Sequence, residues 1–279
     1  MKILLTGGNG RIGRALRPVL RLLAAAHGGQ TLRVSDLDGT STEHAADEEI
    51  LLGNITNTAF MDRLLEGVDL VVHMAATSNE QAFPLVLANN HQGVFELYEG
   101  ARRHGVRRLL YASSNHAFGL HPAGQKLKLD APFAADCFYG LSKVWGEALA
   151  LMYWEKHGIE TVALRIGTFM GVPPRNEREL ATWMGQEDLE AMIRCAVEAK
   201  DVGFAPVWGI SDNRRAYYDV HEPNKIGFVP KQDAEVFAEA TLAAVAGMPV
   251  DPVATRYQGG KFVTQSYTPE AERPKPLRS

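Results

Sequence analysis

A tyrosine and a lysine four residues apart, Tyr139 and Lys143, have the spacing in this sequence that best suits acid–base chemistry. They lie at the start of a predicted helix that continues through Glu147 and Leu151. Residues at positions i and i+4 share one face of a helix, so the phenol and the ammonium can point into the same pocket. Because a nearby positive charge favours phenolate, we expect Lys143 to lower the pKa of Tyr139 and make it a general base. The alternative is a solvated helix face without chemical function.

The length, composition and charge limit the classes of protein to which this chain can belong. With 279 residues, 46% of them hydrophobic and 22% charged, the chain can form one large α/β domain, or a nucleotide-binding domain with a small lobe. A formal net charge of -4 gives no basic surface for nucleic acid or an anionic membrane. No signal peptide, transit peptide or membrane-spanning run is evident, and the two cysteines fit a reducing compartment. We therefore expect a cytoplasmic protein.

A glycine-rich turn near the N-terminus predicts a dinucleotide site. Residues 3–6 are a β-prone apolar run, and apolar residues recur at helical spacing after residue 12. The turn between them lets a pyrophosphate approach bare backbone, and the following helix N-terminus favours an anion. An ordinary loop is the alternative interpretation. The predicted cofactor contacts in this turn are Gly7, Gly10, Arg11, Ile12 and Gly13.

The end of the second predicted strand, residues 31–34, favours NAD over NADP. Asp36 follows it, where a carboxylate accepts hydrogen bonds from the adenosine ribose and would repel a 2′-phosphate. Leu37 is expected beside it in the cofactor site. The alternative is an aspartate that caps the next turn, and Arg33 is expected to face elsewhere.

Later segments supply the other predicted cofactor contacts. Strands are predicted over residues 50–53 and 69–73, and the small residues after the second one allow a flat ligand to lie against the backbone. A helix is expected to open at residues 89–93 and to continue to residue 103. The contacts predicted here are Asn54, Ile55, Met74, Ala75, Ala76 and Asn90.

A polar cluster, Ser113-Ser114-Asn115-His116, follows a fifth predicted strand over residues 108–112. The carboxyl ends of strands form the ligand crevice of a doubly wound sheet, so this cluster is better placed for chemistry than for packing. His116 is a candidate general base, and a histidine that orients the substrate is an equally good interpretation.

The chain after a sixth strand, residues 160–166, is expected to form the substrate side of the protein. An amphipathic helix is predicted over residues 233–246. The nine histidines are scattered, so no metal site is predicted. The candidate wall residues of the substrate pocket are Arg175, Arg178, Trp183, His221 and Phe262.

The glycine turn, Ser114 and the Tyr139-x-x-x-Lys143 pair occur in an order that resembles the extended branch of the short-chain dehydrogenase/reductase superfamily. That resemblance implies a doubly wound parallel sheet, the Rossmann fold, with NAD as cofactor. Segments 113–116, 165–167, 180–183, 206–209 and 256–262 make almost the entire chain similar to the uronate dehydrogenase family. We divide the chain into an NAD-binding core (1–170), a substrate-side lobe with interspersed core elements (171–267) and a mobile tail (268–279).

The resemblance implies a reaction and a role for each site residue. That family oxidises the anomeric C1 of galacturonate or glucuronate to an aldarolactone while it reduces NAD. Tyr139 would be the base, Lys143 its electrostatic partner and ribose ligand, and Ser114 a hydrogen-bond donor to the reacting oxygen. Arg178 is expected to bind the substrate carboxylate, with Arg175 as the alternative. The other implied sugar contacts are Ser78, Asn115, His116 and Thr168, where Thr168 replaces an expected serine.

Two other functions fit the same motifs less well. A sugar-nucleotide epimerase or dehydratase usually has a longer C-terminal lobe, and a non-catalytic NAD-binding sensor has no need of Ser114, Tyr139 and Lys143 together. The expected partner is a small uronic acid, without nucleic acid or membrane. Self-association is common in this superfamily, so a homo-oligomer is expected.

Overall fold

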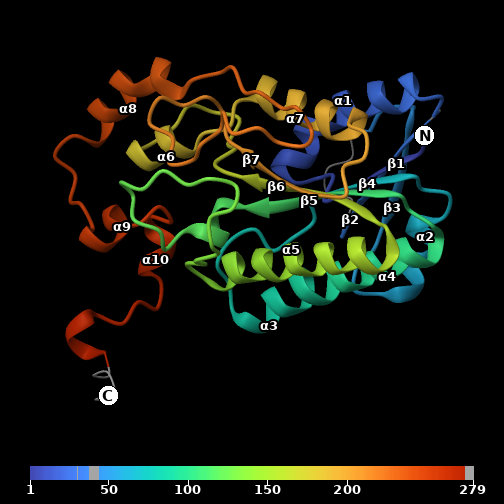
Figure 1. Cartoon of the computed structure of the whole chain (residues 1–279), viewed down its shortest axis with the longest axis horizontal. Coiled ribbons are helices and arrows are strands. Elements are labelled where there is room, and N and C mark those ends of the chain that lie inside the picture. Colours follow the sequence, from blue (N-terminus) through green and yellow to red (C-terminus); the bar gives the residue numbers. More distant parts are fainter. Residues whose placement is uncertain (30, 38–43, 274–279) are drawn as a thin grey trace.

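The computed structural model describes residues 1–29, 31–37 and 44–273, and in this part of the chain seven strands form one parallel sheet (Figure 1). The strands are β1 (Ile3–Thr6), β2 (Leu32–Asp36), β3 (Glu48–Leu52), β4 (Leu70–His73), β5 (Arg108–Ser114), β6 (Glu160–Ile166) and β7 (Phe204–Gly209). Their order in the sheet is β3-β2-β1-β4-β5-β6-β7. The first strand lies near the middle of the sheet. Strands β2 and β3 are added on one side of it, and β4 to β7 are added on the other side, so the strand order reverses between β1 and β4. This is the doubly wound Rossmann arrangement. The predicted fold class is confirmed.

Helices cover both faces of the sheet because its central strands are apolar on both sides (Figure 1). In β1, Ile3 and Leu5 pack in the same core as Leu16 of the first helix, whereas Leu4 belongs to a second core on the opposite face. The helices α1 and α7 lie on one face, and α2, α4 and α5 lie on the other. Their bounds are α1 (Arg11–Ala26), α2 (Thr58–Leu65), α4 (Gly93–His104), α5 (Phe138–His157) and α7 (Gln186–Glu198).

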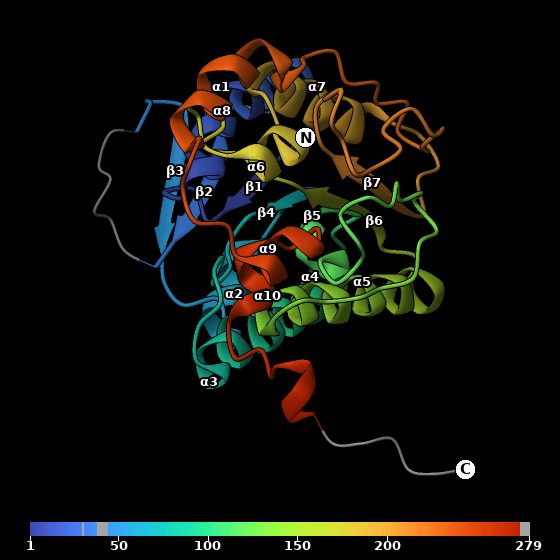
Figure 2. The ribbon, with the colours of Figure 1, turned by 90° about the vertical axis from the view of Figure 1, so that its left-hand side faces the viewer.

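The shorter C-terminal helices gather at the end of the sheet where β5 and β6 finish (Figures 1 and 2). Isolated backbone bridges from Thr168 to Trp183 and from Pro122 to Tyr257 join this region to the loops after β5 and β6. The segments predicted to form the substrate side therefore lie over the carboxyl ends of the strands. These helices are α6 (Glu177–Thr182), α8 (Ala238–Val245), α9 (Pro252–Arg256) and α10 (Lys261–Thr264).

The seventh strand corrects an expectation from the sequence, which ended the core sheet at β6. The β7 segment contains Pro206 and pairs with β6 at the edge of the sheet. Proline is tolerated in an edge strand because one side of the strand needs no ladder hydrogen bonds. This strand lies inside the range assigned to the substrate-side lobe, and the division of the chain at residues 170 and 267 stays a prediction.

Two predicted helices have different bounds in the structure. The helix expected from residues 89–93 begins earlier, as α3 (Phe83–Val86), and continues through a π-helical segment, η1 (Leu87–Gln92), into α4. Residues 233–246 form a 3₁₀ turn, η3 (Ala234–Phe237), before α8.

Two 3₁₀ turns complete the described elements, η2 (Asn115–Phe118) and η4 (Glu270–Glu272). Of the tail predicted to be mobile, residues 274–279 lie outside the described part of the chain. Within the described ranges, none of the helices combines the length and the apolar character that crossing a membrane requires.

Candidate active site

The glycine turn brings three backbone segments into contact at the N-terminus of α1. Gly7 has φ +70°, and a Cβ atom on it would collide with the backbone of Ala75 after β4. A Cβ atom on Gly13 would overlap the Gly7 carbonyl oxygen. The first turn of α1 has no acidic residue, and Gly10 offers no side-chain cap, so the helix N-terminus is available to an anion.

One cavity of about 630 Å³ runs from this turn to the start of α5. It contains most of the site residues expected from the sequence, although they come from β-strand ends, loops and helices far apart in the chain. The predicted residues that line it are Gly7, Gly10, Arg11, Ile12, Gly13, Asp36, Leu37, Asn54, Ile55, Met74, Ala75, Ala76, Ser78, Ser114, His116, Tyr139, Lys143, Thr168 and Arg178.

Asp36 lies at the end of β2 and is held by two backbone amides. Its Oδ2 accepts a hydrogen bond from the Asn9 backbone N–H at 2.8 Å, and its Oδ1 accepts one from Leu37 at 2.8 Å. Each oxygen keeps a further lone pair for a ligand hydroxyl. Arg33 pairs instead with Glu49 and donates to the Leu64 carbonyl of α2, as expected for a residue outside the cofactor site.

Asn90 and Asn115 are the two predicted site residues that do not line the cavity. The Asn90 side chain is buried and accepts from the backbone N–H of Thr77 at 2.8 Å, while its amide donates to Ser142 at 3.0 Å. It therefore ties the loop after β4 to α5, and it is the neighbouring Asn89 that lines the cavity. Asn115 is buried beneath Ser114, whose hydroxyl donates to its Oδ1 at 3.4 Å. Their ligand contacts stay predictions.

Tyr139 and Lys143 face each other in the first two turns of α5. The Lys143 Nζ lies 5.4 Å from the centroid of the Tyr139 ring and 5.1 Å from that of Tyr111, and the lysine is buried. Ser114, at the end of β5, is close enough to the Tyr139 phenol to lower its pKa by hydrogen bonding. The three side chains predicted to carry the chemistry are thus brought together in one cavity.

The pKa of Tyr139 differs in direction from our expectation. Burial raises the pKa of Tyr139 to about 12, and the hydrogen bond with Ser114 opposes this rise. Burial also lowers the pKa of Lys143 to about 7, so the lysine carries only part of its charge at neutral pH. Attraction between the two groups would lower the pKa of Tyr139, but their common loss of solvent has the larger effect here.

The buried lysine predicts a pH dependence of stability. An unfolded lysine has a pKa near 10.4, so between about pH 7 and pH 10 the unfolded chain binds one more proton at this residue than the folded chain. The contribution of Lys143 to the free energy of unfolding should therefore rise with pH across this window. Urea unfolding of the wild type and Lys143→Met at pH 7, 8 and 9 measures the difference in their free energies of unfolding. The control is Lys156→Met, at an exposed position on the same helix, for which we expect a difference that does not change with pH. The same constant difference for Lys143→Met would contradict the prediction.

A buried ion pair fixes the end of β5 against α5. Arg165 of β6 binds Glu147 with two nitrogens, at 3.1 and 2.9 Å, and Ser113 donates to the same carboxylate at 2.5 Å. Glu147 lies one turn after Lys143 on the same helix face, so its carboxylate connects α5 to the strand that carries Ser114. Sequence reasoning did not assign this role, although the Tyr139, Lys143, Glu147 spacing is visible in the sequence.

Glu80 is a second residue that sequence reasoning missed. Its carboxylate accepts hydrogen bonds from the backbone N–H groups of Phe138 at 3.1 Å and Tyr139 at 2.9 Å. An acidic group at a helix N-terminus stabilises the unpaired amides and the helix dipole. Glu80 therefore helps to position Tyr139 from a loop 59 residues away, and no local pattern in the sequence signals that contact.

Arg178, His116 and Phe262, which are predicted to lie on the substrate side, also line the cavity. The imidazole of His116 packs on the Phe262 ring with centroids 3.9 Å apart, and its Nε2 lies 3.5 Å from Nη2 of Arg178. Arg178 donates from Nε to the Gln258 carbonyl at 2.6 Å. The other ring nitrogen of His116, Nδ1, lies 2.7 Å from Oδ2 of Asp136. Because side chains engage both nitrogens, the arrangement favours the substrate-orienting interpretation over the general base.

Arg175 is less suited than Arg178 to bind a carboxylate in the cavity. Its guanidinium is paired with Glu179 one turn along the chain, with Nη2 2.6 Å from Oε1, and 61% of its side chain is exposed. Arg175 nevertheless lines the cavity, whereas two other wall candidates do not: Trp183 packs on Phe237, and His221 faces Asp212.

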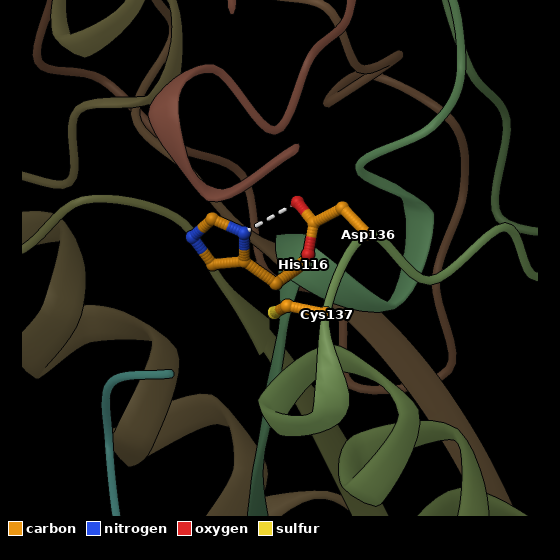
Figure 3. A group of neighbouring side chains, drawn as sticks. All are labelled: His116, Asp136 and Cys137. Atoms are coloured by element: carbon orange, nitrogen blue, oxygen red, sulfur yellow. Dashed lines mark hydrogen bonds and ion pairs between the residues drawn. The ribbon is translucent and has the colours of Figure 1, made fainter. Parts of the chain in front are cut away.

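Three possible metal ligands lie close together near the start of α5: the ligand atoms of His116, Asp136 and Cys137 are within 4.8 Å of one another (Figure 3). The geometry fits a hydrogen-bonded pair better than a metal centre. Nδ1 of His116 lies 2.7 Å from Oδ2 of Asp136, and the Cys137 sulfur accepts from the Gly140 backbone N–H. Burial raises the pKa of the Cys137 thiol, so the thiolate that a metal needs is disfavoured.

Comparisons with known proteins show which family and which structures this chain is similar to. The NAD dependent epimerase/dehydratase family matches residues 3–222. A uronate dehydrogenase from Pseudomonas putida is 38% identical over 94% of this chain and 95% of its own length. A crystal structure of uronate dehydrogenase from Agrobacterium tumefaciens, a mutant in complex with NAD, superimposes with a TM-score of 0.87 at 34% identity, over 94% of this chain and 97% of that one. A glucuronic acid dehydrogenase structure from Chromohalobacter salexigens gives a TM-score of 0.87 at 33% identity, over 94% and 96% of the two chains.

Proposed function

This chain belongs to the NAD dependent epimerase/dehydratase family, and we propose that it is an NAD-dependent uronate dehydrogenase. It oxidises C1 of a hexuronic acid in its ring form to the aldarolactone. The observation that carries this proposal is that one cavity holds both the Tyr139, Lys143 and Ser114 group and the guanidinium of Arg178. An acid–base group and a permanent cation in one cavity suit the oxidation of an anionic sugar. Arginine provides the planar fork that a carboxylate binds with two hydrogen bonds.

The glycine turn and the end of β2 fit a dinucleotide. The bare N-terminus of α1 suits a pyrophosphate, and the Asp36 carboxylate suits a ribose diol. Bound NAD supplies the hydride acceptor. The cavity residues Gly7, Gly10, Gly13 and Asp36 would hold its phosphate and adenosine parts, and Lys143 its second ribose.

The side chains of the site have separate tasks in the reaction. Tyr139 accepts the proton of the C1 hydroxyl, while Ser114 donates a hydrogen bond to the same oxygen. Loss of that proton and of the C1 hydride from a cyclic hemiacetal leaves the ring ester, so the product is a lactone. When the buried Lys143 is protonated, its positive charge favours the phenolate form of Tyr139. Arg178 and His116 hold the carboxylate end of the sugar, which positions C1 for hydride loss.

One spectrophotometric experiment tests the proposal. The purified protein should reduce NAD, followed at 340 nm, with galacturonate or glucuronate, and hardly at all with galactose or UDP-glucose. Turnover of UDP-sugars without turnover of uronates would favour a sugar-nucleotide epimerase or dehydratase instead. NAD binding without turnover of any sugar would favour a sensor.

The cofactor preference tests Asp36 separately. We expect the wild type to use NAD better than NADP, because the Asp36 carboxylate repels a 2′-phosphate. Asp36→Asn removes the charge at nearly constant side-chain volume, and should therefore reduce the preference by about tenfold. Values of kcat/KM for both cofactors at fixed uronate measure this. A wild type that prefers NADP would contradict the assignment of Asp36.

Two further parts of the proposal have their own tests. We propose a cytoplasmic enzyme, in keeping with its two free cysteines, which fluorescence localisation in the source cell would check. We also propose that it self-associates, which light scattering after size-exclusion chromatography would check.

A further inference from the structure

Asp136, in the loop before α5, has a buried carboxylate that the reaction as described does not use. Its side chain has no exposed surface, and its Oδ2 lies 2.7 Å from Nδ1 of His116 (Figure 3). Two glycines make room for this oxygen, because a Cβ atom at either Gly119 or Gly259 would overlap it. The loop after η2 and the C-terminal segment are thus both shaped around one carboxylate.

The other nitrogen of His116 faces a group that can only donate. Nε2 points away from Asp136, and it lies 3.5 Å from Nη2 of Arg178, a long hydrogen-bond contact. A guanidinium has no acceptor, so Nε2 must carry a lone pair toward it and the imidazole proton must be on Nδ1. In the other neutral tautomer the Nε2–H of His116 would face an N–H of Arg178, and the lone pair of Nδ1 would face a carboxylate oxygen of Asp136. Neither contact could be a hydrogen bond, and both would be repulsive.

The surroundings of His116 keep the imidazole neutral. Burial lowers the pKa of His116, and the Arg178 charge lowers it further, while Asp136 and Glu80 partly oppose this shift. The rings of Tyr139 and Phe262 cover the imidazole from two other elements. A neutral histidine has two tautomers, and its hydrogen-bond partners select one.

We propose that Asp136 is a positioning residue that keeps the His116 proton on Nδ1, so that Nε2 accepts from Arg178 and holds its guanidinium toward the substrate carboxylate. The role of Arg178 in this inference rests on the proposed function. The selection of the tautomer by Asp136 does not.

The tautomer can be observed directly by ¹⁵N NMR of the imidazole nitrogens. In the wild type at pH 7.5 we expect His116 to be protonated on Nδ1, and in Asp136→Ala we expect Nε2–H to appear. The control is Asp62→Ala, which removes the carboxylate 3.0 Å from Nε2 of His104 and should leave His116 unchanged. A wild-type His116 protonated on Nε2 would overturn the proposal, whether or not the variant folds.

Kinetics test whether the effect passes through Arg178. Loss of a buried hydrogen-bond partner should raise KM for galacturonate about tenfold in Asp136→Ala, with kcat and NAD affinity within about threefold of wild type. In an Arg178→Met background the same change should raise KM by less than about twofold, because residues that act as a unit are not additive. If Asp136→Ala does not unfold cooperatively, Asp136→Leu, which also offers no acceptor to Nδ1–H, takes its place in the double-mutant cycle.

An equal penalty in both backgrounds would show that Asp136 acts on the fold in general and would overturn the proposal. A wild type inactive on every uronate would instead refute the proposed function. In that case the NMR result still decides whether Asp136 selects the tautomer, so the two failures are distinguishable.

Discussion

Replacement of Tyr139 by phenylalanine is expected to lower kcat for uronate oxidation by about 10²- to 10⁴-fold, the usual contribution of a positioned general base. The change removes one oxygen atom and keeps the ring near Lys143 and His116. The KM for uronate and the affinity for NAD should therefore change little. Steady-state kinetics together with NAD titration separate the two effects.

The pH profile identifies the proton acceptor. Burial raises the pKa of Tyr139 to about 12, so the fraction of phenolate, and with it the wild-type kcat, should increase between pH 7 and pH 9. Tyr139→Phe should lose this increase. The matched control is Tyr153→Phe on the same helix, whose hydroxyl donates to Glu99 away from the cavity. A Tyr139→Phe enzyme with near wild-type kcat would refute the assigned base.

Replacement of Arg178 by alanine is expected to raise KM for uronate by about 10²-fold or more, since removal of one partner of a buried charge pair costs about 2–5 kcal/mol. Arg178→Lys should recover only part of this loss, because an ammonium cannot form the two parallel hydrogen bonds of a guanidinium. NAD affinity should hold, as Arg178 lies at the substrate end of the cavity.

Arg175→Ala is the matched control for this prediction. Arg175 is mostly exposed and paired with Glu179, so its removal should change KM by less than about threefold. If Arg175→Ala gave the large increase and Arg178→Ala did not, the carboxylate site would lie three residues earlier in the chain. Thermal unfolding of Arg178→Ala is needed beside the kinetics, because Arg178 also donates to the Gln258 carbonyl.

The two halves of the site were not equally visible in the sequence. The strand, glycine turn and helix at the N-terminus, and the Tyr139 and Lys143 pair, are local patterns whose spacing follows from the geometry of one turn or one helix. The C-terminal third has short elements and no long period. Its assignment depended on resemblance, and its seventh strand escaped recognition because Pro206 interrupts the pattern of an ordinary core strand.

The sequence by itself determined the fold class, and it predicted the cofactor turn and the Tyr139 and Lys143 pair, because each depends on residues that are close together in the chain. Tertiary structure decided what loss of solvent does to those groups: it raises the pKa of Tyr139 to about 12 and lowers that of Lys143 to about 7. It also decided which of the two arginines in the cavity wall is paired with a glutamate and mostly exposed, and which carboxylate faces His116. Burial and contacts between distant segments depend on how the chain closes around the site, and local spacing carries no record of that closure.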